Sequence, residues 1–112
     1  MRKEYRRMRK HPQTLFGLRL RHARERAAMA QDRLGVLIGI DEGCSSARIS
    51  RYETGTHAPP FEVAKKMAAV LNIPVAYLYC EDEGLAEMIV ELSHLTKTDL
   101  AKIRKLIRQL RN

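Results

Sequence analysis

The spacing of apolar residues is the feature that most restricts the fold of this chain. Phe61, Ala64, Met67 and Leu71 follow one another at intervals of three or four residues, which places them on one face of a helix. Similar intervals recur in other segments, and glycine or proline separates several of these segments. Helix-forming residues dominate, and only 5% of the residues are aromatic. The 112 residues therefore predict an all-α chain with a single modest core.

Capping residues set the expected limits of the helices. Thr14 is a candidate N-cap for the first helix, and Gly39 can end the second in the left-handed conformation. Pro60 opens the fourth helix, and Thr98 is expected to cap the last. Gly35 lies inside the second helix and is interpreted as a place where another helix approaches closely. The expected helices cover residues 14–27, 29–38, 45–53, 59–72, 74–80, 85–95 and 98–110.

The positive charge is concentrated at one end of the chain. The net charge is +8, and residues 1–26 carry all of that excess, with ten basic residues against two glutamates. Residues 1–13 lack an apolar face and are predicted to form a flexible basic arm. Such an arm favours a polyanionic partner, most often nucleic acid, although a tail that serves only solubility is an alternative. The arm residues expected to contact phosphates are Arg6, Arg7, Arg9 and Lys10.

The last third of the chain has two segments of opposite charge. Residues 81–91 carry five acidic residues and no basic one, whereas residues 97–112 carry six basic residues and one acidic one. Each segment also has an apolar stripe at helical spacing. We predict a C-terminal helical hairpin over residues 81–112 that forms a homodimer or binds another protein. The alternative is that both helices simply cover the core.

Several classes of protein find no support in the sequence. No apolar run is long enough to span a membrane. Cys44 and Cys80 are expected to be free thiols, which indicates a cytoplasmic protein. The four histidines are scattered, and neither a phosphate-binding loop nor a nucleophile motif is present. The sequence therefore predicts a protein that is not an enzyme and has no cofactor or bound metal.

An ordered set of short motifs carries a family resemblance. Residues 49–55 read Ile-Ser-Arg-Tyr-Glu-Thr-Gly, and Met29-Ala30-Gln31, Leu34-Gly35 and Gly39-Ile40 precede them at set spacings. In this pattern, which covers about residues 16–79, the chain resembles the phage-repressor/Cro-type (Xre) family of helix-turn-helix transcriptional regulators. The resemblance implies a five-helix, lambda-repressor-like DNA-binding domain over residues 14–80, between the basic arm and the two-helix extension. In that fold the third helix enters the major groove of DNA.

The resemblance also implies which residues meet double-stranded DNA. The family's base-reading positions fall on Ser46, Ala47 and Arg51, and Arg51 suits guanine because a guanidinium can bind its O6 and N7 together. Arg24 and Glu53 correspond to a structural ion pair in the family. The remaining residues expected at DNA are Gln31 and Ser45 at phosphates, Arg48, which can reach either DNA or the protein surface, and Thr56 and His57 at the backbone after the helix.

The chain departs from the family pattern between the second and third helices. Eight residues, DEGCSSAR, separate Ile40 from Ile49, where the family has about four. We predict that residues 41–44 form an inserted loop and that Ser45 or Ser46 caps the third helix. Asp41 and Glu42 are then expected to point away from DNA or to cap the helix. Cys44 is interpreted as an inert thiol, with a redox gate as the alternative.

The sequence as a whole predicts a DNA-binding transcriptional regulator. Its simplest form is a repressor that binds a pseudo-palindromic operator as a homodimer and occludes promoter DNA, in the cytoplasm at the nucleoid. One alternative is a DNA-binding antitoxin whose C-terminal helices bind a toxin. Another is a protein- or RNA-interaction module on the same fold.

Overall fold

The computed structural model describes residues 11–112, and this part of the chain is all-α, without a β-strand. The predicted fold class is therefore confirmed. The predicted arm residues Arg6, Arg7, Arg9 and Lys10 lie outside the described residues. The elements in chain order are α2 (Leu15–Arg26), α3 (Gln31–Leu37), α4 (Glu42–Thr54), α5 (Phe61–Val70), the short 3₁₀ helix η1 (Val75–Tyr79), α6 (Glu83–Ser93) and α7 (Lys97–Arg111).

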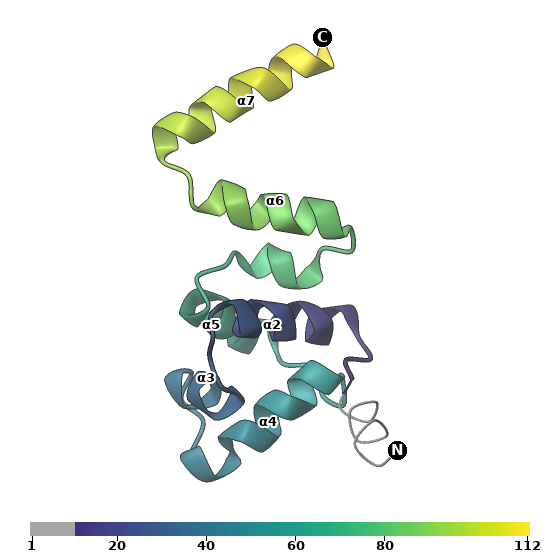
Figure 1. Cartoon of the computed structure of the whole chain (residues 1–112), viewed down its shortest axis with the longest axis vertical. Coiled ribbons are helices and arrows are strands. Elements are labelled where there is room, and N and C mark those ends of the chain that lie inside the picture. Colours follow the sequence, from purple (N-terminus) through teal and green to yellow (C-terminus); the bar gives the residue numbers. More distant parts are fainter. Residues whose placement is uncertain (1–10) are drawn as a thin grey trace.

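The first five of these elements lie together in one part of the molecule (Figure 1), and their side chains enclose one core. Each contributes at least one side chain with no exposed surface: Leu20, Leu34, Ile49, Met67 and Leu78. α6 lies on the outside of η1 and adds the fully buried Ala86 to the same core. The predicted amphipathic pattern therefore converges on a single hydrophobic centre. None of the helices between residues 11 and 112 is long and apolar enough to cross a membrane.

Capping residues fix the ends of α2 and α3 as predicted. The hydroxyl of Thr14 accepts a hydrogen bond from the backbone N–H of Gly17 at 3.0 Å and caps α2. Gly39 follows α3 with a φ of 97°, a left-handed conformation that a glycine adopts without a steric penalty. Both signals are local in sequence, and both could be recognised without the tertiary structure.

The predicted loop at the start of the third helix is wrong. α4 begins at Glu42, and the carboxylate of Asp41 accepts a hydrogen bond from the N–H of Gly43 at 3.2 Å. The residues beyond the family pattern thus form an additional helical turn, and neither Ser45 nor Ser46 is the cap. Asp41 satisfies a free N–H, and Glu42 is an acid at the positive end of the helix dipole. The expectation that Asp41 could cap the helix is confirmed.

Removing this cap is expected to reduce the stability of the domain. Asp41→Ala should lower the free energy of unfolding by about 1 kcal/mol, the usual loss when an N-cap acceptor is removed. Urea unfolding monitored by circular dichroism measures the change. Asp41→Asn keeps a hydrogen-bond acceptor, so its free energy of unfolding should fall much less. Equal stabilities for Asp41→Ala and the wild type would contradict the assigned cap.

α3 and α4 pack closely at Gly35. A Cβ atom at Gly35 would lie 1.8 Å from the Oγ of Ser45, so only glycine fits there without a shift. Ser45 itself is fully buried, and its hydroxyl donates to the carbonyl oxygen of Asp32 at 2.6 Å. The interpretation of Gly35 as a place of close helix approach is confirmed.

The two C-terminal helices differ in how they use their apolar stripes. α6 packs on the core through Ala86, with Ile89 and Val90 partly buried beside it. α7 contains no buried residue. It begins two residues earlier than expected, because Thr96 rather than Thr98 caps it by accepting a hydrogen bond from the N–H of Asp99. The core-covering alternative therefore describes α6 and does not describe α7.

Candidate nucleic-acid interface

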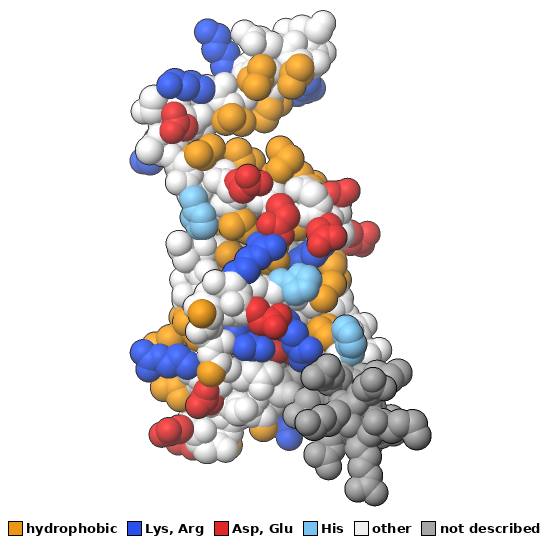
Figure 2. Space-filling model, in the orientation of Figure 1, with side chains coloured by type: hydrophobic (Ala, Val, Ile, Leu, Met, Phe, Trp, Pro, Cys, Tyr) orange, Lys and Arg blue, Asp and Glu red, His pale blue; other side chains and the backbone are white. Residues whose placement is uncertain are grey.

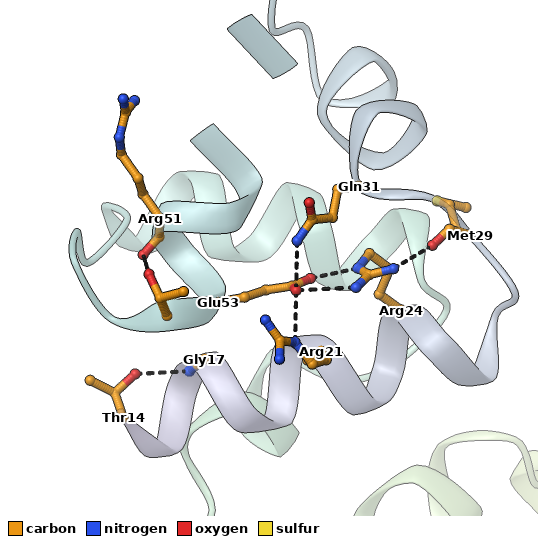
Figure 3. Close-up of polar contacts among 9 residues, drawn as sticks. Thr14, Gly17, Arg21, Arg24, Met29, Gln31, Arg51 and Glu53 are labelled. Atoms are coloured by element: carbon orange, nitrogen blue, oxygen red, sulfur yellow. Dashed lines mark hydrogen bonds and ion pairs between the residues drawn. The ribbon is translucent and has the colours of Figure 1, made fainter. Parts of the chain in front are cut away.

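A buried carboxylate joins α2, α3 and α4 (Figure 3). The side chain of Glu53 on α4 has no exposed surface. Its oxygens accept hydrogen bonds from Arg24 Nε at 2.5 Å and Nη2 at 3.1 Å, from Arg21 Nε at 3.1 Å, and from Gln31 Nε2 at 3.0 Å. Arg24 also donates from Nη1 to the carbonyl oxygen of Met29 at 2.9 Å, in the connection before α3. One side chain thus fixes three helices relative to one another.

The electrostatics of this cluster favour the charged form of Glu53. Burial by itself pushes the pKa of Glu53 upward, but the hydrogen bonds from Arg24, Gln31 and Arg21 outweigh it and hold the pKa below its usual value. The same contact with Glu53 raises the pKa of Arg24. A buried carboxylate that is paired and fully hydrogen-bonded stays ionised, and this keeps the cluster intact.

The opposite side of α4 faces solvent. Ile49, Tyr52 and Glu53 are buried, whereas Ala47 and Arg51 are exposed. Figure 3 shows the side chain of Arg51 extending away from the Glu53 cluster. Buried and exposed residues alternate at helical spacing because α4 is packed along one face only. The outer face of α4 is therefore free to meet a partner.

The structure brings most of the predicted interface residues to this outer face or its edges. Ser46 is exposed beside Ala47, and Arg48 is exposed at the edge of a hollow of about 280 Å³ that Tyr52 and Lys66 also line. Thr56 and His57 are exposed and directly follow Gly55, which ends α4 with a φ of 88°. The backbone N–H of His57 donates to the carbonyl oxygen of Arg51 at 3.2 Å, which folds this segment back against the helix end.

Two predicted contact residues have other partners. Ser45 was expected near a phosphate, but its buried hydroxyl bonds to Asp32 and cannot reach DNA while α3 and α4 remain packed. This correction follows from the earlier start of α4, which moves Ser45 from the cap into the helix interior. Gln31 is only partly buried, and one amide N–H is used by Glu53. Its second amide N–H can still be offered to a partner.

The structure adds residues that the sequence did not indicate. Gly43 and Cys44 lie in the extra turn of α4 and are exposed, one helical turn before Ala47 and Arg48. Asp41 ahead of Gly43 was a signal for this turn, since an acid before a helix is a common N-cap. Arg21 joins the Glu53 cluster without any sequence signal that separates it from its neighbouring arginines.

Arg19 has a structural role that the sequence did not indicate. It is only 3% exposed. Its Nε donates to the carbonyl oxygen of Cys80 at 3.1 Å, and its Nη2 donates to that of Glu81 at 3.1 Å. Its guanidinium lies 5.8 Å from the centre of the Tyr77 ring. Arg19 thus attaches the segment before α6 to α2, and its role is structural.

The fold and this exposed helix define a helix-turn-helix domain. The family model described as "helix-turn-helix domain" matches residues 15–77, more than half of the chain. Among solved structures, the transcriptional regulator BswR is 42% identical in sequence, with a TM-score of 0.80; the match covers 83% of this chain and 92% of the other. No curated protein sequence matches. The chain belongs to the helix-turn-helix family.

Proposed function

We propose that this protein is a DNA-binding transcriptional regulator that reads its operator with α4 in the major groove. The observation that carries the proposal is the Glu53 cluster, which holds α2, α3 and α4 together and leaves the outer face of α4 exposed. An α-helix fits the major groove, and in helix-turn-helix proteins the second helix of the motif makes the base contacts. The similarity to the transcriptional regulator BswR supports a role in the regulation of transcription.

The exposed residues of α4 divide into base and backbone contacts. Arg51 is proposed to bind a guanine through O6 and N7, and Ala47 to contact a thymine methyl. Ser46 adds a hydroxyl that can pair with either a base or a phosphate. Arg48, at the helix edge, is proposed to contact the backbone. Gly43 lies one turn before Ala47 and has no side chain, so it permits the backbone of α4 to approach DNA closely.

Residues outside α4 are proposed to position it on the duplex. Gln31 can donate its second amide N–H to a phosphate while it remains bonded to Glu53. Thr56 and His57, after the helix, are proposed to contact the backbone on the other side. The arm residues Arg6, Arg7, Arg9 and Lys10 would add salt-dependent phosphate contacts. Ser45 is left out of this set, because it is buried.

The simplest biological role is a repressor that binds a pseudo-palindromic operator as a homodimer and occludes a promoter. Two copies of α4 would then meet two half-sites about one helical turn of DNA apart. The exposed apolar side chains of α7 favour a protein contact at the C-terminal end, which a second copy of the chain would provide. A toxin bound at the same surface is the second candidate, and it would make this protein an antitoxin.

The Arg51→Ala variant tests whether α4 reads bases. The preferred operator is first selected from a random DNA pool, and the affinity for it is compared with the affinity for random duplex at one salt concentration. Loss of a bidentate arginine–guanine contact is worth about 1–3 kcal/mol, so the preference for the operator should fall roughly 5- to 150-fold. Arg33→Ala removes an exposed arginine of α3 and should leave that preference unchanged. An unaltered preference in Arg51→Ala would contradict the assignment.

A further inference from the structure

α7 is an amphipathic helix whose apolar side is partly buried at Leu100 and Ile103 and exposed in its second half. Its 15 residues include Leu106, Ile107 and Leu110, which are 50%, 49% and 78% exposed. A single helix of this length is only marginally stable in water, and most helices in proteins are stabilised by packing an apolar face. Figure 1 shows α7 leading away from the rest of the domain. The helix therefore needs a surface outside its own domain to cover this side.

α6 offers a second uncovered surface of the same kind. One side of α6 packs on the core through Ala86, while Leu85 and Met88 point elsewhere and are 52% and 53% exposed. Leu95, just after the helix, is 39% exposed. In Figure 2, hydrophobic side chains lie on both sides of the opening between α6 and α7. Exposed apolar patches of this kind mark interaction sites in soluble proteins.

The charges of the two helices are complementary. α6 carries Glu83, Glu87 and Glu91 and no basic residue, whereas α7 carries six basic residues and only Asp99 as an acid. Glu87 is paired with Arg26, and Glu83, one turn before it, lines a hollow with Arg26 and His22 of α2. Glu91 is exposed and has no ion pair with any residue in 11–112. Two α7 helices placed together would oppose like charges, and so would two α6 helices. Contact between an α6 and an α7 brings opposite charges together.

The chain holds its own α7 away from its own α6. Only residues 94–96 connect the two helices. The ring Nε2 of His94 lies 3.0 Å from the carbonyl oxygen of Asn72, which ties the end of α6 to the domain. Thr96 caps α7 immediately afterwards. With both helix ends fixed this closely, α7 is directed outward, toward a second molecule.

We propose that two copies of this chain exchange their C-terminal helices, so that α7 of each copy packs on the outer face of α6 in the other. The apolar stripe of α7 then covers Leu85 and Met88 of the second copy, and its basic residues face Glu91. The contact is made twice about a two-fold axis, which closes the assembly as a dimer. This inference rests on the homodimer of the proposed function and specifies which surfaces form it.

A charge-reversal experiment on the full chain tests the exchange. One variant carries Glu91→Lys on α6, and the other carries Arg104→Glu and Arg111→Glu on α7; all three side chains are exposed. Each variant alone opposes like charges at both contacts, so its dimer dissociation constant in sedimentation velocity should rise about tenfold or more. An equimolar mixture should regain the wild-type constant as a heterodimer, and so should one chain with all three changes.

Other arrangements give different results. If α7 paired with α7, reversal on α6 would leave dimerisation unchanged, and the proposal would be overturned. Failure of the mixture to recover, or a wild-type chain that is monomeric at micromolar concentration, would also overturn it. Circular dichroism checks that each variant is folded, and Lys65→Glu, an exposed change on α5, is the control for charge alone.

DNA binding separates this proposal from the proposed function. The reversed variants keep the α4 surface, so they should retain an Arg51-dependent preference for a single half-site while losing the cooperative binding of paired half-sites. Loss of sequence preference with an intact dimer would contradict base reading by α4 and leave the helix exchange standing. If the variants kept their preference for a half-site but the mixture did not recover dimerisation, the helix exchange would be contradicted and base reading by α4 would stand.

Discussion

Replacing Glu53 with glutamine is expected to lower the free energy of unfolding by about 3–5 kcal/mol, the usual effect of breaking a buried ion pair. Glutamine has nearly the same shape, so the loss reports charge and hydrogen bonding more than volume. The variant would place an uncharged amide against Arg21 and Arg24, which point at the carboxylate in the native protein. Urea unfolding followed by circular dichroism measures the change. Since α4 is held by this cluster, operator affinity should fall as well.

The exposed pair between Arg26 and Glu87 supplies a matched control. Both side chains are substantially exposed, at 51% and 38%. Exposed ion pairs contribute about 0–1 kcal/mol because water screens them. Glu87→Gln is therefore expected to change stability far less than the same substitution at Glu53. Equal losses in the free energy of unfolding at the two positions would show that burial is not the reason why the Glu53 cluster stabilises the protein.

Acid provides a second check on the charge of Glu53. Its pKa in the folded protein lies below the ordinary value of 4.5, because the bonds from Arg24, Gln31 and Arg21 outweigh the upward effect of burial. A carboxylate with a lowered folded pKa contributes stability above its unfolded pKa, and this is lost as the pH falls through the folded pKa. The wild type should therefore lose more stability in acid, below pH 4.5, than Glu53→Gln does.

Gly17→Ala is expected to destabilise the protein by about 3 kcal/mol, at the upper end of the usual range for overpacking. An added Cβ would lie 2.0 Å from the carbonyl oxygen of Glu53 and 2.7 Å from its carbonyl carbon. These are backbone atoms, which cannot turn aside as a side chain can. α2 would have to move away from α4, and this would also stretch the bonds from Arg21 and Arg24 to Glu53.

Gly84→Ala is the matched control for this change. Gly84 also lies in the first turns of a helix, α6, where the nearest atom to an added Cβ is Asp82 Oδ1 at 3.4 Å. Alanine favours a helix over glycine by about 1 kcal/mol, so this variant should be neutral or slightly more stable in thermal unfolding. A Gly17→Ala protein as stable as Gly84→Ala would show that α2 and α4 do not pack as closely as described.

Helix ends and core positions were predicted well where the signal lies in a few neighbouring residues. Thr14 caps α2, Gly39 ends α3, and the apolar residues at helical spacing form the core. Each of these signals depends on a few neighbouring residues, whose conformational preferences hold in most contexts. The short acidic segment before Ser45 was misread because glycine and serine disfavour helices on average. Asp41 as the cap and the packing of Ser45 against Gly35 outweigh that preference.

The all-α class could be predicted from the periodicity of the apolar residues alone. The helix-turn-helix order and the candidate reading residue Arg51 came from the family resemblance that the spaced motifs carry. Only the tertiary structure decided that Arg21 and Gln31 join Arg24 on Glu53, that Arg19 is buried, and that α6 packs while α7 does not. The physical reason is distance along the chain. Arginines on one helix are alike in sequence, and their partners lie 29 to 62 residues away, so burial and pairing appear only when the helices have packed.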